Sequence, residues 1–101
     1  MKDNWNIETQ AVQGAYWPGN AEPRVLPIVQ STTYRYDTCE ELAKVFDLEQ
    51  DTFMYTRLGN PTTDAFEKKM AMMEGGVGAL ATSSGMGATV LTVLNIAKAR
   101  D

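Results

Sequence analysis

The chain has 101 residues, of which 44% are hydrophobic and 22% charged, a composition of one small globular domain rather than of a disordered segment. Thirteen acidic against nine basic residues give a formal charge of −4, so the sequence offers no basic surface for a nucleic-acid backbone. It has no histidine and one cysteine, Cys39, which excludes Ser-His-Asp triads, histidine-containing zinc sites and internal disulfides. We expect no metal site.

A membrane span is also not expected. No stretch approaches the roughly 18 consecutive apolar residues that a span requires, and residues 1–6 are too polar to open a secretory signal. These features predict a cytoplasmic protein without a membrane partner. Cys39 lies at a predicted helix start, where a plain helix residue is expected rather than a reactive thiol.

The first third of the chain predicts an extended arm. Residues 1–37 hold three of the four prolines, turn-forming residues at 18–20 and no sustained apolar period. The arm carries five of the chain's aromatic side chains, namely Trp5, Tyr16, Trp17, Tyr34 and Tyr36. They pack either on the arm's own domain or on a partner subunit, and the sequence leaves both alternatives open.

Two helices are predicted next. A capping box that begins at Thr38, followed by apolar residues on one face, predicts a short helix near 39–49. Asn60 as N-cap and Pro61 as first helical residue predict a second helix, which the glycines at 75–76 end. The predicted apolar face of the second helix consists of Phe66, Met70 and Met73, while Glu67, Lys68 and Lys69 are expected to face water.

The last third predicts a strand and a further helix. Residues 77–82 form a short apolar run between glycine and serine, which favours a buried strand. Residues 86–97 are apolar almost all round, which predicts a helix buried on most sides. Such a strand needs parallel neighbours, and no second one precedes Asp101. We therefore expect an α/β fold with an incomplete sheet, as if cut within an open sheet.

Two places are candidates for binding an anion. The turn at residues 83–87 brings backbone N–H groups and the positive end of a helix to one point, which suits phosphate; the alternative is an ordinary glycine-rich turn. Tyr55 and Arg57 lie on one side of an extended segment and offer a phenol and a guanidinium fork; the alternative is an exposed arginine beside a packing tyrosine. The turn at 83–87 is not a known nucleotide fingerprint, because Val90 stands where GxGxxG has its third glycine.

Three segments together resemble the N-terminal part of the Cys/Met-metabolism enzymes that depend on pyridoxal phosphate (PLP). The segments are residues 55–62, residues 73–76 at the end of the second helix, and residues 79–86. Upstream, residues 22–28, 30–34 and 46–49 are most similar to the O-acetylhomoserine sulfhydrylase branch, and methionine γ-lyase is the next most similar. The resemblance covers nearly the whole chain.

The resemblance implies a fold and a cofactor site. The fold would be that of a fold-type-I PLP-dependent transferase, with an arm containing one short helix over 1–52 and the start of the PLP-binding domain over 53–101. In this family, the tyrosine and arginine corresponding to Tyr55 and Arg57 bind the cofactor phosphate in the neighbouring subunit of a dimer or tetramer. The backbone amides of Gly85 and Met86 would hold the phosphate of their own subunit.

The resemblance also implies a reaction for the parent protein, in which sulfide replaces the acetate of O-acetylhomoserine to give homocysteine. Methionine γ-lyase, cystathionine γ-synthase and cystathionine γ-lyase are the alternatives. The family's Schiff-base lysine lies further along than residue 101, so the chain alone is expected to hold no catalytic residue and to be inactive. The four lysines on predicted helices are not expected to replace it, because they sit at polar or terminal positions: Lys44, Lys68, Lys69 and Lys98. A non-catalytic truncated module that pairs with a full-length subunit is the alternative from another class.

Overall fold

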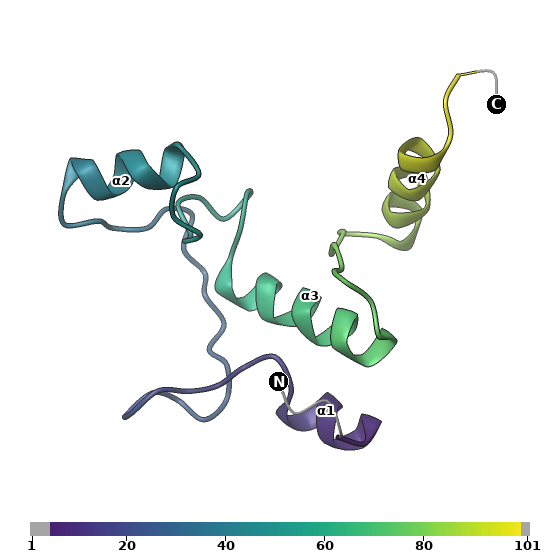
Figure 1. Ribbon diagram of the computed structural model, residues 1–101, viewed down its shortest axis with the longest axis horizontal. Coiled ribbons are helices and arrows are strands. Elements are labelled where there is room, and N and C mark those ends of the chain that lie inside the picture. Colours follow the sequence, from purple (N-terminus) through teal and green to yellow (C-terminus); the bar gives the residue numbers. More distant parts are fainter. Residues whose placement is uncertain (1–4, 100–101) are drawn as a thin grey trace.

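The computed structural model describes residues 5–99, which contain four helices joined by extended segments (Figure 1). The helices are α1 (Ile7–Gln13), α2 (Cys39–Phe46), α3 (Pro61–Glu74) and α4 (Gly85–Ile96). The radius of gyration is 16.6 Å, against about 13 Å for a compact domain of 100 residues. The chain is therefore open, and α1 and α3 are the only two helices in contact within the described part. Residues 1–4 of the predicted arm and residues 100–101 lie outside the described residues.

The predicted bounds of α3 are confirmed, and its caps are the reason for them. The Asn60 side chain accepts a hydrogen bond from the backbone N–H of Thr62 at 2.8 Å, and Pro61 occupies the first helical position. Gly75 ends the helix in the left-handed conformation at φ 65°, which glycine adopts without steric cost. Both ends are thus determined by atoms only a few residues away.

The helix predicted near 39–49 forms as α2, with the expected cap. Thr38 accepts a hydrogen bond from the backbone N–H of Glu41 at 3.2 Å. The helix stops at Phe46, earlier than predicted, and Leu48 takes a positive φ of 59° that no helix can continue through. On the inner face of α2, Val45 is almost completely buried.

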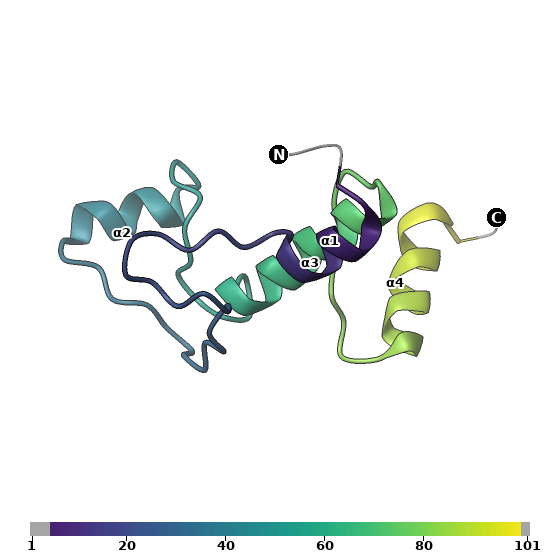
Figure 2. The ribbon, with the colours of Figure 1, turned by 90° about the horizontal axis from the view of Figure 1, so that it is seen from below.

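The arm contains a helix, α1, that the sequence does not predict. Its N-cap, Asn6, makes no side-chain capping bond, and the helix has only seven residues. It therefore shows neither a capping interaction nor a length at which an isolated helix is stable. α1 lies along α3 (Figure 2). Lys69 on α3 donates from Nζ to the carbonyl oxygen of Ala11 at 3.0 Å. Packing against α3, rather than its own propensity, accounts for this short helix.

Gly14, which follows α1, is buried in this contact and leads to a prediction about stability. An added Cβ would overlap the Met72 methyl group and lie 2.5 Å from the carbonyl oxygen of Gln10. Met72 can move aside, but the backbone oxygen cannot without disturbing α1. We expect Gly14→Ala to lower the free energy of unfolding of the whole protein by about 1–3 kcal/mol, measured by urea denaturation.

The matched control for Gly14→Ala is Gly78→Ala, because a Cβ at Gly78 meets no heavy atom within 4 Å. That control should change the unfolding free energy by no more than about 0.5 kcal/mol. Equal effects of the two substitutions would show that α1 does not depend on close packing at Gly14.

The predicted buried strand at 77–82 does not form, and the prediction of an incomplete sheet is wrong for the described residues. The segment is extended, but within residues 5–99 the one β-type pairing is an isolated antiparallel bridge between Thr33 and Tyr55. Leu80 in the segment is 74% exposed. A strand exists only with a neighbour that accepts and donates its backbone hydrogen bonds, and among the described residues none pairs with this segment.

The helix predicted at 86–97 forms as α4, but the prediction that it is buried on most sides is wrong. None of its residues is buried in the described part of the chain, and Leu94 and Ile96 are 70% and 76% exposed. Its N-cap is Ser84, whose side chain accepts from the backbone N–H of Gly87 at 3.0 Å. The cap forms locally, whereas burial needs a surface that these residues do not supply.

Candidate functional site

Tyr55 and Arg57 lie on the turn that precedes α3, with their side chains together as predicted. Arg57 Nη2 donates to Tyr55 Oη at 3.2 Å, and the guanidinium carbon lies 5.2 Å from the centre of the tyrosine ring. The turn is closed by hydrogen bonds from the N–H groups of Leu58 and Gly59 to the carbonyl oxygen of Tyr55, at 2.9 and 3.0 Å. Arg57 is exposed and Tyr55 half-buried. The pair can therefore offer several N–H donors and a phenol to one anion.

A segment of the arm, residues 27–34, runs beside this turn; we call it the strap. The backbone N–H of Thr56 donates to the carbonyl oxygen of Thr32 at 2.9 Å, and Thr56 Oγ1 hydrogen-bonds the carbonyl oxygen of Ser31. Tyr34 Oη lies 3.1 Å from Thr56 Oγ1. This part of the arm thus packs on its own chain, and Thr56, the residue between Tyr55 and Arg57, is its main attachment point.

Gly85 and Met86 form the first turn of α4, where the second predicted anion site lies. The carbonyl oxygen of Ser84 accepts from the N–H of Ala88 at 3.1 Å and its side chain accepts from Gly87, but in residues 5–99 the N–H groups of Gly85 and Met86 have no acceptor. A Cβ on Gly85 would meet no heavy atom within 4 Å, so the space beside it is open. Two open amides at a positive helix end suit an anion.

The two predicted anion sites are not brought together in this chain. The Tyr55–Arg57 turn leads into the N-terminus of α3, whereas the 77–84 segment starts from the C-terminus of α3 and leads to α4 (Figure 1). Within the described part, no hydrogen bond joins one site to the other. Each place offers hydrogen-bond donors of its own, and the described chain does not join the two sets.

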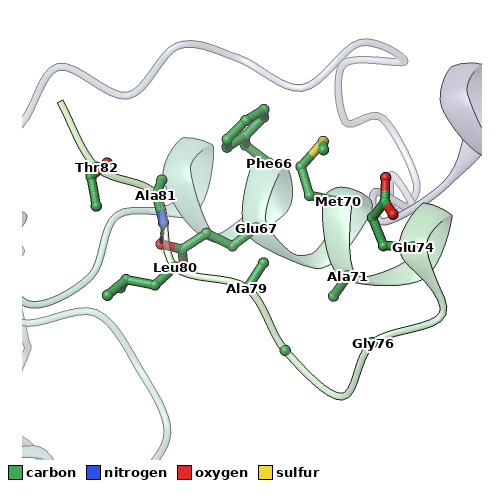
Figure 3. Close-up of a pocket in the computed structure, with 11 residues that line it drawn as sticks. Phe66, Glu67, Met70, Ala71, Glu74, Gly76, Ala79, Leu80, Ala81 and Thr82 are labelled. Atoms are coloured by element: carbon green, nitrogen blue, oxygen red, sulfur yellow. Dashed lines mark hydrogen bonds between the residues drawn. The ribbon is translucent and has the colours of Figure 1, made fainter. Parts of the chain in front are cut away.

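Glu67, which was expected to face water, instead holds the segment that leads to α4. Its Oε1 accepts a hydrogen bond from the backbone N–H of Ala81 at 2.7 Å (Figure 3). The contact closes one side of a hollow of about 390 Å³ between α3 and the segment, which is lined by Phe66, Glu67, Met70, Ala71, Glu74, Gly76 and residues 78–82. The hollow holds no pair of facing ionisable groups, so we assign it no chemistry. The sequence missed this role, because periodicity does not show that a helical carboxylate meets a distant backbone amide.

Among residues 5–99, the other ionisable groups form no further candidate site. Two lysines on α3 donate hydrogen bonds to oxygen atoms. Lys68 pairs with Asp64 Oδ2 at 2.6 Å, and Lys69 donates to the carbonyl oxygen of Ala11. Across residues 5–99, no group of three or more acidic or cysteine side chains is placed to hold a metal ion. In the same residues, every helix is too short or too polar to cross a membrane.

Comparisons with known proteins agree on one enzyme family. Residues 8–101 match a family model described as Cys/Met metabolism PLP-dependent enzyme. An O-acetyl-L-homoserine sulfhydrylase of Leptospira meyeri is 43% identical over 98% of this chain, and an L-methionine gamma-lyase of Fusobacterium nucleatum subsp. polymorphum is 47% identical over 75% of it. The aligned parts are 23% and 19% of those relatives. The chain therefore spans about a quarter of their length or less.

A solved structure shows the same backbone arrangement. The chain superposes on a crystal structure of an O-acetylhomoserine (thiol)-lyase from Campylobacter jejuni with a TM-score of 0.86 and 35% identity, covering 97% of this chain and 24% of the other. That crystal structure contains an N'-pyridoxyl-lysine-5'-monophosphate. The open arrangement of helices described above is thus one that occurs inside a larger protein of known structure.

Proposed function

The chain belongs to the family of Cys/Met-metabolism PLP-dependent enzymes, and on this premise we propose that the whole protein is an O-acetylhomoserine sulfhydrylase. It would convert O-acetylhomoserine and sulfide into homocysteine and acetate. The observation that carries the proposal is the Tyr55–Arg57 pair, which presents a phenol and a guanidinium side by side on a closed turn. The branch is supported by two sulfhydrylases that are 42–43% identical to almost the whole chain.

The residues of this chain fit a phosphate-bearing cofactor. Arg57 would bind the phosphate by charge-assisted hydrogen bonds, and Tyr55 would add its hydroxyl as a donor. The amides of Gly85 and Met86 would neutralise the phosphate oxygens from the helix end. In the described residues no carboxylate forms an ion pair with Arg57, so its charge is available to an anion. When bound, PLP supplies the electron sink that the sulfur amino-acid chemistry requires.

We propose that Tyr55 and Arg57 act in the site of a neighbouring subunit of a homodimer or tetramer. In Figure 1 the turn that carries Tyr55 and Arg57 lies apart from the start of α4, which holds Gly85 and Met86, and this arrangement supports the proposal. In the assembly each phosphate would then have donors from two subunits. We also propose that residues 1–52 are an arm and that residues 53–101 begin the PLP-binding domain.

A second candidate is methionine γ-lyase, favoured by the relative of that name that is 47% identical over 76 residues. The two activities differ in what leaves the γ-carbon and in whether a sulfur nucleophile is required. Cystathionine γ-synthase and cystathionine γ-lyase are less supported alternatives. A non-catalytic module that pairs with a full-length subunit would bind no substrate of its own.

An assay of the whole protein separates the two candidates. With PLP bound, we expect homocysteine from O-acetylhomoserine plus sulfide, and no methanethiol from methionine. The control reaction lacks sulfide and should yield no homocysteine. Turnover of methionine without homocysteine synthesis would replace the first proposal by the second. A protein that binds PLP and turns over neither substrate would contradict both.

A further inference from the structure

We propose that Asn60 is a positioning residue: it holds the Tyr55–Arg57 turn in its phosphate-binding shape by joining the turn to the strap and to α3. This inference rests on the proposed function, because it assigns a role to Asn60 at the same cofactor site. Asn60 itself touches neither cofactor nor substrate in this proposal. It acts through Thr56, which lies between the two phosphate-binding side chains.

Asn60 is buried and its amide is used on both sides. The residue is 5% exposed, and it is the buried polar residue of the described chain. Its Oδ1 accepts from the N–H of Thr62 at 2.8 Å, while its Nδ2 donates to the carbonyl oxygen of Val29 at 2.9 Å and to Thr56 Oγ1 at 3.1 Å. Asn60 Oδ1 faces α3, while Nδ2 faces the strap at Val29 and the turn at Thr56, so these partners fix the orientation of the amide. Only an amide meets both demands.

The hydrogen bonds converge on Thr56, the residue between Tyr55 and Arg57. Thr56 Oγ1 accepts a hydrogen bond from Asn60 Nδ2 and donates to the carbonyl oxygen of Ser31. The backbone N–H of Thr56 is held by the strap at 2.9 Å from the Thr32 oxygen. With its backbone and its side chain both fixed, Thr56 cannot rotate without breaking these bonds. The directions of the side chains on either side of it are then set before an anion binds.

A second set of bonds ties the strap to the first turn of α3. Thr62 Oγ1 donates to the carbonyl oxygen of Pro27 at 2.9 Å and accepts from the N–H of Val29 at 2.9 Å. The strap is therefore attached to Asn60 through the Val29 carbonyl oxygen, and to Thr62 through the Val29 N–H and the Pro27 carbonyl oxygen. A turn held at its start by the strap and at its end by a helix loses little freedom on binding, which is the physical basis of preorganisation.

N-capping can be separated from positioning by the choice of substitution. Asn60→Ser keeps a good N-cap for α3 but removes the donors to Val29 and Thr56, and Asn60→Asp keeps the cap but places an oxygen against the Val29 carbonyl. The matched control is Thr38→Ala, which removes the cap of α2, away from the turn. Should the Asn60 variants fail to fold, Thr56→Val, which removes the Thr56 hydroxyl, is compared with Thr56→Ser, which retains it.

The test uses apoenzyme of the full-length protein, reconstituted with PLP or with pyridoxal, which lacks the phosphate, and followed by the cofactor absorbance band. We expect Asn60→Ser to weaken PLP binding about tenfold, since the hydrogen bonds to Val29 and Thr56 are lost. Asn60→Asp should weaken it more, because its carboxylate also faces the Val29 carbonyl oxygen. Pyridoxal binding should be unchanged in both variants. Thr38→Ala should keep the PLP affinity, and Thr56→Ser should bind PLP more tightly than Thr56→Val.

Several outcomes would overturn the inference, and they are distinct from failure of the proposed function. Equal losses of PLP and pyridoxal affinity in Asn60→Ser would show a general structural role, as would an equal PLP loss in Thr38→Ala. If Arg57→Ala weakens PLP binding while the Asn60 and Thr56 variants do not, only the positioning role is wrong. If Arg57→Ala also leaves PLP binding unchanged, the proposed cofactor site itself is wrong.

Discussion

Arg57→Ala in the whole protein is expected to weaken PLP binding by about ten- to hundredfold. A hydrogen bond to a charged group contributes about 1.5–3 kcal/mol, and each 1.4 kcal/mol corresponds to about tenfold in affinity. Arg57 presents its guanidinium beside the Tyr55 hydroxyl with no carboxylate partner in the described residues, so its charge is not already neutralised. Pyridoxal, which has no phosphate, should bind the variant as well as it binds the unaltered protein. The measurement is titration of apoenzyme with each compound.

Arg35→Ala is the matched control for Arg57→Ala. Arg35 pairs with Asp37 at 3.0 Å on the surface, where the two side chains are 88% and 81% exposed. Such a pair contributes little to stability, and its loss should leave the PLP affinity unchanged. A similar weakening in both variants would indicate an effect of net charge alone, and the Tyr55–Arg57 site would have to be abandoned.

The proposal that Arg57 crosses to a neighbouring subunit has its own readout. Arg57→Ala subunits mixed with subunits that lack the Schiff-base lysine should regain activity, since some mixed dimers contain one intact site. If Arg57 acts within its own subunit, one site of every mixed dimer lacks the lysine and the other lacks Arg57, so mixing restores no site. Activity no higher than the sum of the two separate variants would contradict the crossing.

Gly85→Pro is expected to weaken PLP binding by about tenfold while α4 remains folded. The substitution removes one of the two amide donors, and proline is well tolerated at the first position of a helix. Ser84, the preceding residue, already has the extended backbone that proline requires before it, with φ −155° and ψ 153°. Circular dichroism should therefore show unchanged helix content, and the PLP titration should show the loss.

The control for Gly85→Pro is Gly85→Ala, which retains the N–H. A Cβ at this position meets no heavy atom of the described chain within 4 Å, so the variant should fold normally. A smaller loss of PLP affinity than in Gly85→Pro is expected. If Gly85→Ala loses as much as the proline variant, the space beside Gly85 matters and the hydrogen bond from its amide does not.

The predicted starts of α2 and α3 and the predicted end of α3 agree with the structure, and at each the deciding atoms lie within about one turn. The caps at Thr38 and Asn60 and the left-handed Gly75 depend on hydrogen bonds over two to five residues. The pairing of Tyr55 with Arg57 is similarly local. Their binding roles, and those of Gly85 and Met86, stay predictions, because no ligand contact tests them.

The errors have a common physical origin. Residues 77–82 have the composition of a buried strand and α4 that of a buried helix, but a strand needs paired neighbours and an apolar helix needs a covering surface. Within residues 5–99 neither partner is supplied, so the segment is unpaired and α4 is exposed. An apolar composition predicts that a segment is buried only where another surface covers it. The described residues supply no such surface for residues 77–82 or for α4.

By itself, the sequence determined the bounds of α3, the N-cap of α2, the contact of Tyr55 with Arg57 and the family, because each depends on residues close in sequence. The tertiary structure alone decided the rest. It formed α1 against α3, directed Glu67 to the amide of Ala81, and buried Asn60 between the strap and the turn that carries Tyr55 and Arg57. These contacts join residues 14 to 58 positions apart, a separation at which local propensity carries no information about which groups will meet.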